Sequence, residues 1–369
     1  MDTRPSNAGP AAPTASQDAA GRHETEAAPA PGATMRAVVQ DAYGGADVLR
    51  LDTVRVPVPA ADQVLVRVRA ASLNAADWHL MKGQPFFMRA LGFGVRRPRS
   101  RVRGIDAAGH VVAVGTAVTT LRPGDEVWAE AAYDGRGTGT LAEYVVLPEG
   151  RASLKPAGLT FEQAAAVPLA ACTALQGLRD SGKVGPGQKV LINGASGGVG
   201  TFAVQIAKAL GAEVTAVCST RNVELVRSLG ADHVIDYTRE DFTRRHVPGA
   251  SGSERYDVVL DLVANRSVRD LRRALRPTGT LVLSGGGGGR WLGPIPLMVR
   301  ALVAGVFGRQ TVRVLSESFS QDDLAVLRAL IESGKVTPAI DRVYTLAEAP
   351  SAMRYLVEEH ARAKVVVVV

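Results

Sequence analysis

The stretch Lys189–Gly200, KVLINGASGGVG, constrains the fold of this chain more than any other. It begins with a short apolar run, which is typical of a strand buried on both faces. Four of the eight residues from Asn193 to Gly200 are glycine, and apolar residues then recur at helical spacing up to Leu210. This pattern predicts a strand, a glycine turn and a helix, a unit that can hold a pyrophosphate at the positive end of the helix. A purely structural turn is the alternative.

The segment from about Leu159 onward alternates strands with helices. After a first strand expected at Lys189–Asn193, five further strands are expected at Glu213–Cys218, His233–Asp236, Tyr256–Asp261, Thr280–Ser284 and Thr311–Leu315. Helical stretches that end at glycine or proline separate most of them. Six strands joined by helical crossovers predict a doubly wound parallel sheet.

The segment from Met35 to about Lys155 is rich in strand signals, with one helical stretch near Asn74–Met81. The run Lys364–Val369 reads as a strand that suits a return to this β-rich unit. Residues 1–34 are rich in alanine and proline without periodicity, so we expect a disordered tail.

Composition excludes several classes of protein. The 369 residues suggest two or three domains. Only two cysteines are present, which excludes a disulfide scaffold and a four-cysteine zinc site. No uninterrupted apolar run reaches ~18 residues, so no membrane span is expected, and no secretory signal is visible. The net charge of +7 suits anionic ligands but equally reflects genomic composition. A soluble cytoplasmic protein is therefore expected.

Several motifs together resemble the medium-chain dehydrogenase/reductase superfamily, and more narrowly its zinc-free quinone oxidoreductase-like branch. They are GIDAAGHVVAVG with GDEV, GTLAEYVVLP, INGASGGVG, LGADHVIDY and the closing KVVV. The resemblance implies an α/β protein with a GroES-like β-rich catalytic domain and a Rossmann domain with a six-stranded parallel sheet. The expected boundaries are 35–156 for the catalytic domain, completed by 313–369, and 157–312 for the Rossmann domain. The active-site cleft is then expected between the two.

The glycine turn is expected to bind the cofactor. Ala195 stands where the dinucleotide fingerprint G-x-G-x-x-G has its first glycine, an exchange that this branch tolerates. The predicted contacts in the turn are Ala195, Ser196, Gly197, Gly198, Val199 and Gly200. The resemblance adds Tyr237 on the adenosine side, with Ser284 and Gly285 on the nicotinamide side. An ordinary loop aromatic and a flexible glycine loop are the respective alternatives.

The end of the second strand points to NADPH. An NAD site usually places a carboxylate there to bind the ribose 2′-OH, whereas this chain has Ser219, Thr220 and Arg221. Hydroxyls and a guanidinium suit a 2′-phosphate. Relatives often carry a lysine at the next position, where this chain has Asn222.

The substrate site is predicted to lack a metal. By resemblance, Asn74 stands at the first cysteine ligand of the zinc-dependent branch, and Asp106 stands at its His-Glu pair. Without a Lewis acid, the chemistry favours hydride delivery to a carbon that is already electrophilic, as in a quinone or enone. Asn74 is the first candidate donor to the substrate oxygen, followed by Tyr133 and Thr173. Solvent is the proposed proton source.

The loop that follows the predicted helix carries two unusual clusters. Pro85–Met88 with Leu91 predicts either an apolar wall for a planar substrate or packing within the loop. Five arginines follow, and they favour a solvated loop over contact with phosphate or an anionic substrate. No aromatic residue interleaves with them, so nucleic acid is not the expected partner. The five are Arg96, Arg97, Arg99, Arg101 and Arg103.

The sequence therefore predicts a zinc-independent, NADPH-dependent reductase of quinones or α,β-unsaturated carbonyls. An alcohol dehydrogenase or an enoyl-thioester reductase on the same fold is the alternative within enzymes. A protein that binds NADPH without significant turnover is the alternative from another class. The resemblance implies a homodimer that forms through the cofactor domain.

Overall fold

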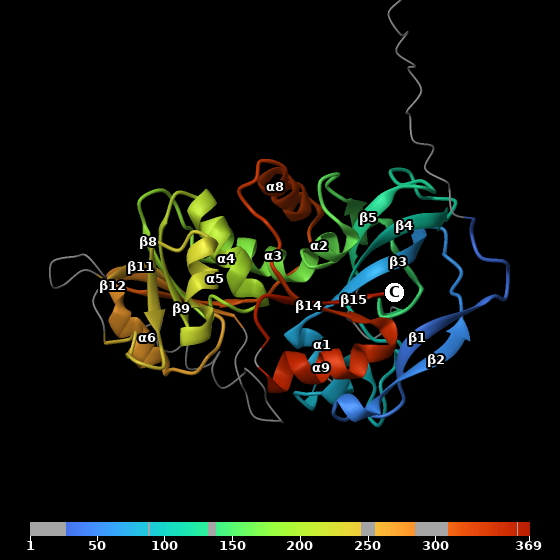
Figure 1. Cartoon of the computed structure of the whole chain (residues 1–369), viewed down its shortest axis with the longest axis horizontal. Coiled ribbons are helices and arrows are strands. Elements are labelled where there is room, and N and C mark those ends of the chain that lie inside the picture. The colour runs from blue at the N-terminus through green and yellow to red at the C-terminus, as the bar shows by residue number, and fades with distance from the viewer. Residues whose placement is uncertain (1–26, 88, 132–137, 245–254, 285–308, 360) are drawn as a thin grey trace, which may run out of the picture.

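A six-stranded parallel sheet forms one lobe of the molecule, on the left in Figure 1. In this computed structural model we describe residues 27–87, 89–131, 138–244, 255–284, 309–359 and 361–369. The strands lie in the order β10-β9-β8-β11-β12-β13. Their bounds are β8 (Lys189–Asn193), β9 (Glu213–Cys218), β10 (His233–Asp236), β11 (Tyr256–Asp261), β12 (Leu275–Ser284) and β13 (Thr311–Leu315).

This order confirms the predicted doubly wound sheet. β8 lies inside the sheet, between β9 and β11. Its residues Val190–Ile192 are fully buried, as expected of a strand that is covered on both faces. The direction of winding reverses between β8 and β11, and ligands of such sheets bind where this reversal meets the carboxyl ends of the strands. β12 begins at Leu275 rather than at the predicted Thr280.

α4, α5 and α6 pack against this sheet, α2 and α3 link it to the second lobe, and α1 and α9 belong to that second lobe. α4 is buried over every residue from Gly200 to Ala207, as expected of a helix packed inside the protein rather than on its surface. The helices are α1 (Ala75–Lys82), α2 (Phe161–Ala165), α3 (Pro168–Leu175), α4 (Gly198–Ala209), α5 (Val223–Ser228), α6 (Val268–Ala274), α8 (Gln321–Glu332) and α9 (Ala349–Glu358). Short helical turns are η1 (Ala46–Val48), η2 (Arg89–Phe93), η3 (Glu149–Arg151), η4 (Gln176–Ser181), η5 (Thr220–Asn222) and η6 (Leu346–Glu348).

The second lobe is a β-rich domain built from both ends of the chain (Figure 1). Its larger sheet has the order β14-β15-β3-β4-β5-β7, with β6 also paired to β3, and β1 pairs with β2 in a separate sheet. β15 joins β3 in antiparallel register, with Val365 opposite Leu73, as the predicted return of the chain requires. The strands are β1 (Thr34–Gln40), β2 (Leu49–Arg55), β3 (Gln63–Leu73), β4 (Asp106–Val114), β5 (Glu126–Glu130), β6 (Tyr144–Pro148), β7 (Ala152–Leu154), β14 (Ile340–Thr345) and β15 (Lys364–Val368).

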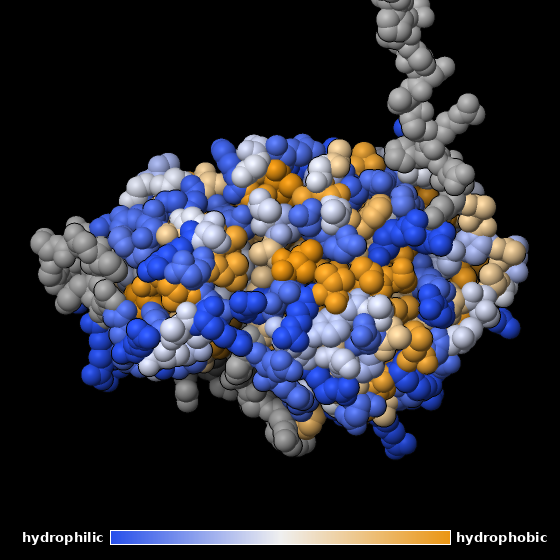
Figure 2. All heavy atoms as spheres, in the orientation of Figure 1, coloured by the Kyte–Doolittle hydropathy of each residue, from blue (hydrophilic) through white to orange (hydrophobic). Residues whose placement is uncertain are grey.

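One hydrophobic core crosses from lobe to lobe. Trp128 of β5 and Val366 of β15 belong to the same buried cluster as α3 and the strands β8 and β9. Figure 2 also shows apolar surface across the middle of the molecule, where the two lobes of Figure 1 meet. The two lobes are therefore packed as one body along α2 and α3.

The sequence-based domain boundaries stay predictions, and the structure adds three facts to them. β13 continues to Leu315, so a boundary at 312 falls inside this strand. α2 follows residue 157 but contacts β3, β4 and β15 of the β-rich lobe. β1 begins at Thr34, and the carbonyl of Ala33 accepts the N–H of Val56, so ordered chain precedes Met35.

Candidate active site at the junction of the two lobes

The glycine turn leaves the first N–H groups of α4 available to a ligand. The first amide of α4 to bond back across the turn is that of Thr201, which donates to Gly197 O at 2.9 Å. The N–H groups of Gly198, Val199 and Gly200 precede it, at the positive end of a 12-residue helix. No side chain caps this end. The turn therefore fits the pyrophosphate of a dinucleotide.

Close backbone packing explains the last glycine of the turn. A Cβ on Gly200 would lie 2.1 Å from Gly194 O, so only glycine lets α4 approach β8 this closely. Ala195 is fully buried, and its N–H donates to Val217 O of β9 at 3.1 Å. Ala195 therefore fixes the turn through its backbone.

The end of β9 lies beside the glycine turn, and Asn222 holds the two together. Its amide donates to the hydroxyls of Ser196 at 3.0 Å and Ser219 at 3.2 Å. This buried asparagine stands where the resemblance predicts a lysine in many related proteins. It joins two predicted cofactor contacts that the sequence did not connect.

Thr220 and Arg221 each bond to a neighbouring segment. The Thr220 hydroxyl donates to Asp236 at 2.5 Å, and Arg221 Nη2 donates to Glu359 O at 3.0 Å. Hydrogen bonds from Thr220 and Thr238 lower the pKa of Asp236, so this carboxylate is an anion at neutral pH. An acid at the end of β10 is thus close to the predicted 2′-phosphate site, which sequence inspection of β9 alone missed.

The remaining predicted cofactor residues lie at strand ends of the same sheet. Tyr237 follows β10, is 44% exposed and donates its N–H to Cys218 O. Ser284 ends β12 opposite Leu315. Gly285 lies outside the described residues.

Asn74 lies where β3 ends and α1 begins, and two charged groups hold its side chain. Its Nδ2 donates to Asp106 Oδ2 at 2.9 Å, and Lys364 Nζ donates to its Oδ1 at 2.6 Å. Lys364 and Asp106 also form an ion pair at 3.6 Å. All three side chains are buried.

Asp106 connects Asn74 to α3. Asp106 Oδ1 accepts the N–H of Leu169 at 3.2 Å, and its Oδ2 also accepts the hydroxyl of Ser72 at 3.2 Å. Thr173 lies one turn along α3, but its hydroxyl donates to Leu169 O at 2.6 Å. The proton of Thr173 is therefore engaged within its helix. Tyr133 lies outside the described residues.

Burial and mutual proximity shift the pKa values of this cluster. Burial raises the pKa of Asp106, which Lys364 opposes most strongly, and burial lowers the pKa of Lys364, which Asp106 opposes. Burial raises the pKa of Asp77 to about 7 and that of Glu130, which lies opposite Asp106 in the sheet, to about 9. Three hydrogen bonds to Asp106, together with the ammonium of Lys364, favour its charged form.

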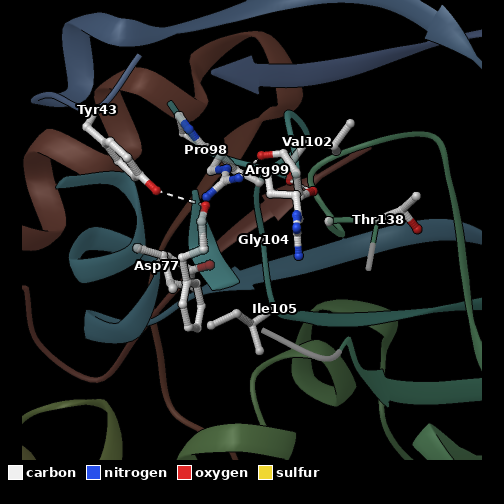
Figure 3. Close-up of a pocket in the computed structure, with 13 residues that line it drawn as sticks. Tyr43, Asp77, Pro98, Arg99, Val102, Gly104, Ile105 and Thr138 are labelled. Atoms are coloured by element: carbon white, nitrogen blue, oxygen red, sulfur yellow. Dashed lines mark hydrogen bonds between the residues drawn. The ribbon is translucent and has the colours of Figure 1, made fainter. Parts of the chain in front are cut away.

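A pocket opens beside α1 in the β-rich lobe (Figure 3). Its lining includes Tyr43, Asp77, Leu80, Phe93 and Ile105. The Tyr43 hydroxyl donates to the carbonyls of Phe93 and Gly94, at 2.9 and 2.7 Å, and so fixes the loop that forms one wall.

The predicted apolar wall and arginine run are only partly at this pocket. Pro85, Phe86 and Phe87 are half-buried and are not among its lining residues, while Met88 and the side chain of Leu91 lie outside the description. Arg99 and Arg103 line the pocket. Arg101 pairs with Asp41, and Arg96 and Arg97 are exposed, as expected of a solvated loop.

Lys364, like Asp236, is a site residue that the sequence reasoning missed. A signal was present, because a single lysine begins an otherwise all-valine strand that is buried in the sheet. Lysine is almost never fully buried unless it has a partner. The sequence could not show that the partner, Asn74, lies 290 residues away.

The described segments hold neither a metal-binding cluster nor a membrane-spanning helix. No group of three or more His, Cys, Asp or Glu side chains in these segments is arranged to hold a metal ion. The same segments contain no helix with the length and apolar character needed to span a membrane.

Comparison with known proteins agrees with this architecture. A family model described as an alcohol dehydrogenase GroES-like domain matches residues 60–157, and one described as a zinc-binding dehydrogenase matches residues 229–367. The chain is 33% identical over 344 residues to the chloroplastic quinone-oxidoreductase QR1 of Triphysaria versicolor, covering 91% of this chain and 99% of that protein.

Two further similarities also cover about nine-tenths of this chain. The chain is 37% identical over 344 residues to the chloroplastic NADPH-dependent alkenal/one oxidoreductase of Arabidopsis thaliana, covering 90% of this chain and 79% of that protein. The solved quinone oxidoreductase from Coxiella burnetii superimposes with a TM-score of 0.78 at 30% identity, covering 91% of this chain and 100% of that one. The β-rich lobe is thus a GroES-like domain beside a Rossmann domain, and the chain belongs to the quinone oxidoreductase-like branch of the medium-chain dehydrogenase/reductase superfamily.

Proposed function

We propose that this protein is a zinc-independent reductase that uses NADPH to reduce a quinone or an α,β-unsaturated carbonyl. The observation that carries the proposal is the side chain of Asn74, held by Lys364 and Asp106 at the lobe junction. NADPH, when bound, supplies the hydride. The names of the two curated relatives, a quinone oxidoreductase and an alkenal/one oxidoreductase, support the same substrate classes.

Asn74 is the proposed donor to the oxygen on which negative charge develops as the substrate accepts hydride. One amide hydrogen of Asn74 bonds to Asp106, which leaves the other for the substrate. A preorganised donor in a buried site contributes about a hundredfold or more to kcat. Thr173 is a weaker candidate because its proton is engaged by Leu169.

The contacts of Asn74 and Asp106 support the proposed zinc independence. Their polar atoms bond to each other and to the Lys364 ammonium, so a side-chain cation already lies between them. Chelators are expected to leave activity unchanged. One tightly bound zinc per chain, with activity lost on its removal, would contradict this part of the proposal.

NADPH is the proposed cofactor because Ser219 and Arg221 offer donors at the end of β9, beside Thr220, whose own proton is engaged by Asp236. A hydrogen bond to a charged group is worth roughly 1.5–3 kcal/mol, so the preference for NADPH over NADH is expected to be at least about tenfold in kcat/KM.

A cytoplasmic location and a homodimer remain predictions. β13 lies at the edge of the Rossmann sheet and offers a place for a second copy.

The pocket beside α1 is the proposed site for the apolar part of the substrate. Leu80, Phe93 and Ile105 supply apolar walls, and Asp77 in its lining lies one helical turn from Asn74. This assignment differs from the wall predicted at Pro85–Met88 with Leu91, of which Pro85, Phe86 and Phe87 do not line the pocket.

The deciding experiment measures NADPH oxidation against a panel of quinones, enones, saturated aldehydes and enoyl thioesters. Turnover of quinones or enones, reduced about a hundredfold or more in Asn74→Leu, is the expected result. Preference for aldehydes or thioesters would identify the alternative enzymes. Tight NADPH binding without turnover of any compound would identify a binding protein.

A further inference from the structure

Lys364 links the cofactor turn to Asn74. Its side chain is 2% exposed, and its stem lies so close to the turn that a Cβ on Gly198 would be 3.1 Å from Lys364 Cδ. The preceding residue, Ala363, donates its N–H to Ser196 O at 2.8 Å. The end of the same side chain bonds to Asn74. One residue thus contacts both halves of the junction.

The partners of Asn74 dictate which way its amide points. The nitrogen of Lys364 donates, and the carboxylate of Asp106 accepts. Oδ1 of Asn74 must therefore face Lys364, and Nδ2 must face Asp106. A half-turn of the amide would set Nδ2 against an ammonium and Oδ1 against a carboxylate, and both contacts would be repulsive.

This arrangement leaves Asn74 with one defined role. Its oxygen is engaged by Lys364 and one of its two amide hydrogens by Asp106. Only the second hydrogen is left to donate. A cation on the oxygen also polarises the amide and strengthens the remaining N–H as a donor.

We propose that Lys364 and Asp106 are positioning residues that fix the amide of Asn74, so that its remaining N–H meets the substrate oxygen. This inference rests on the proposed function. Two other roles for Lys364 predict different effects. If it bound the cofactor, its replacement would lower the affinity for NADPH. If it donated a proton, it would have to lose its charge during turnover.

The test compares Lys364→Met with a matched control, Lys155→Met. Lys155 is also a buried lysine of the β-rich lobe, but it donates to Leu159 O at 2.7 Å and pairs with Glu126. Steady-state rates, NADPH affinity from fluorescence titration, and the isotope effect with deuterated NADPH are measured for both. Circular dichroism establishes that each variant is folded. If Lys364→Met does not fold, the double variant Lys364→Met/Asp106→Asn, which removes the unpaired charge, replaces it.

Lys364→Met is expected to lower kcat about a hundredfold, with NADPH affinity changed less than about threefold and a larger isotope effect. Lys155→Met is expected to keep its kcat. Lys364→Gln keeps a neutral donor, so it should recover part of the rate. A loss of NADPH affinity that accounts for the whole fall in kcat/KM would overturn the inference, as would an unchanged kcat. Equal loss in Lys364→Gln and Lys364→Met would also overturn it, in favour of proton donation.

A second readout does not require turnover. The side-chain amide of Asn74, assigned by its disappearance in Asn74→Asp, is observed by NMR in 15N-labelled protein. Slow solvent exchange of the amide hydrogens in wild type, accelerated about tenfold or more in Lys364→Met, is expected. Unchanged exchange in Lys364→Met would overturn the positioning role, whether or not the wild type reduces any compound of the panel. A wild type that reduces none of these compounds would by itself refute only the proposed function.

Discussion

At the scale of single residues, the end of β9 combines donors for a phosphate with a nearby acid. Thr220 bonds to the carboxylate of Asp236, while Arg221 reaches toward Glu359. A carboxylate repels a 2′-phosphate, and a guanidinium attracts it. The choice between NADPH and NADH should therefore depend on the balance between these two side chains.

Replacing each side chain should shift that balance in opposite directions. Arg221→Ala is expected to lower the ratio of kcat/KM for NADPH over NADH about tenfold, and Asp236→Asn to raise it about threefold or more. Asp241→Asn is the control, because Asp241 accepts the same kind of bonds from Thr243 elsewhere in the domain. An unchanged ratio in both test variants would show that the 2′ position lies elsewhere.

Glu130 should make stability depend on pH. Burial raises its pKa to about 9, helped by Asp106 and Glu317 and opposed by Arg151. The folded protein then holds a proton that the unfolded chain releases near its ordinary pKa of 4.5. Stability should therefore fall as pH rises from about 5 to about 9.

Glu130→Gln should flatten this dependence. Urea unfolding at about pH 6 and about pH 9 is expected to show the variant losing at least about 1 kcal/mol less than wild type over that interval. Parallel pH profiles for the two proteins would show that Glu130 is ionised in the folded state.

At the scale of elements, the glycine turn works through close contact between α4 and β8. Gly200→Ala would bring a Cβ within 2.1 Å of Gly194 O and 2.7 Å of Ala195, both backbone atoms that cannot move aside alone. We expect a loss of about 1–3 kcal/mol in the free energy of unfolding. Gly185→Ala, where nothing lies within 4 Å of the new Cβ, should change it little. Equal stability of the two variants in urea would contradict the packing role.

The edge of the β-rich lobe offers a second element-scale prediction. A chain that starts at Met35 loses the bond from Val56 to Ala33 and the pairing of Thr34 with Arg55. Net contributions of such bonds are about 0.5–1.5 kcal/mol each. The chain should therefore be about 1 kcal/mol less stable than one that starts at Ala27, with unchanged kcat. Identical melting temperatures would show that these two residues add nothing.

At the scale of the whole molecule, the core that runs through α3 should make the lobes unfold together. Trp128 lies in β5 of the β-rich lobe, yet it belongs to a buried cluster that also contains residues of β8 and β9 in the other lobe. With Trp78 and Trp291 replaced by Phe, fluorescence of Trp128 and far-UV circular dichroism should share one urea midpoint. An earlier fluorescence transition would show that the GroES-like domain melts alone.

The sequence predicted the Rossmann sheet well because each strand there is a short apolar run with its own turn signals. The bounds of β8, β9, β10, β11 and β13 agree with those predicted. The site was predicted less well, because its contacts depend on which segments meet. Asp236 contacts Thr220, and Lys364 contacts Asn74, across different elements of the fold. Neither local spacing nor periodicity in the sequence predicts such contacts.

The placement of β15 has a consequence for how the protein is made. One half of an edge of β3, Gln63–Arg67, pairs with β6, which follows soon in the chain, and the other half, Ala70–Leu73, pairs with β15. Lys364 is 290 residues from Asn74 in the sequence. A ribosome needs roughly 15–60 s to translate a segment of that length. During that time the nascent chain carries an open, apolar strand edge, and Asn74 lacks its contact with Lys364. The Rossmann domain can fold within this interval, whereas the GroES-like domain must wait for its final strand.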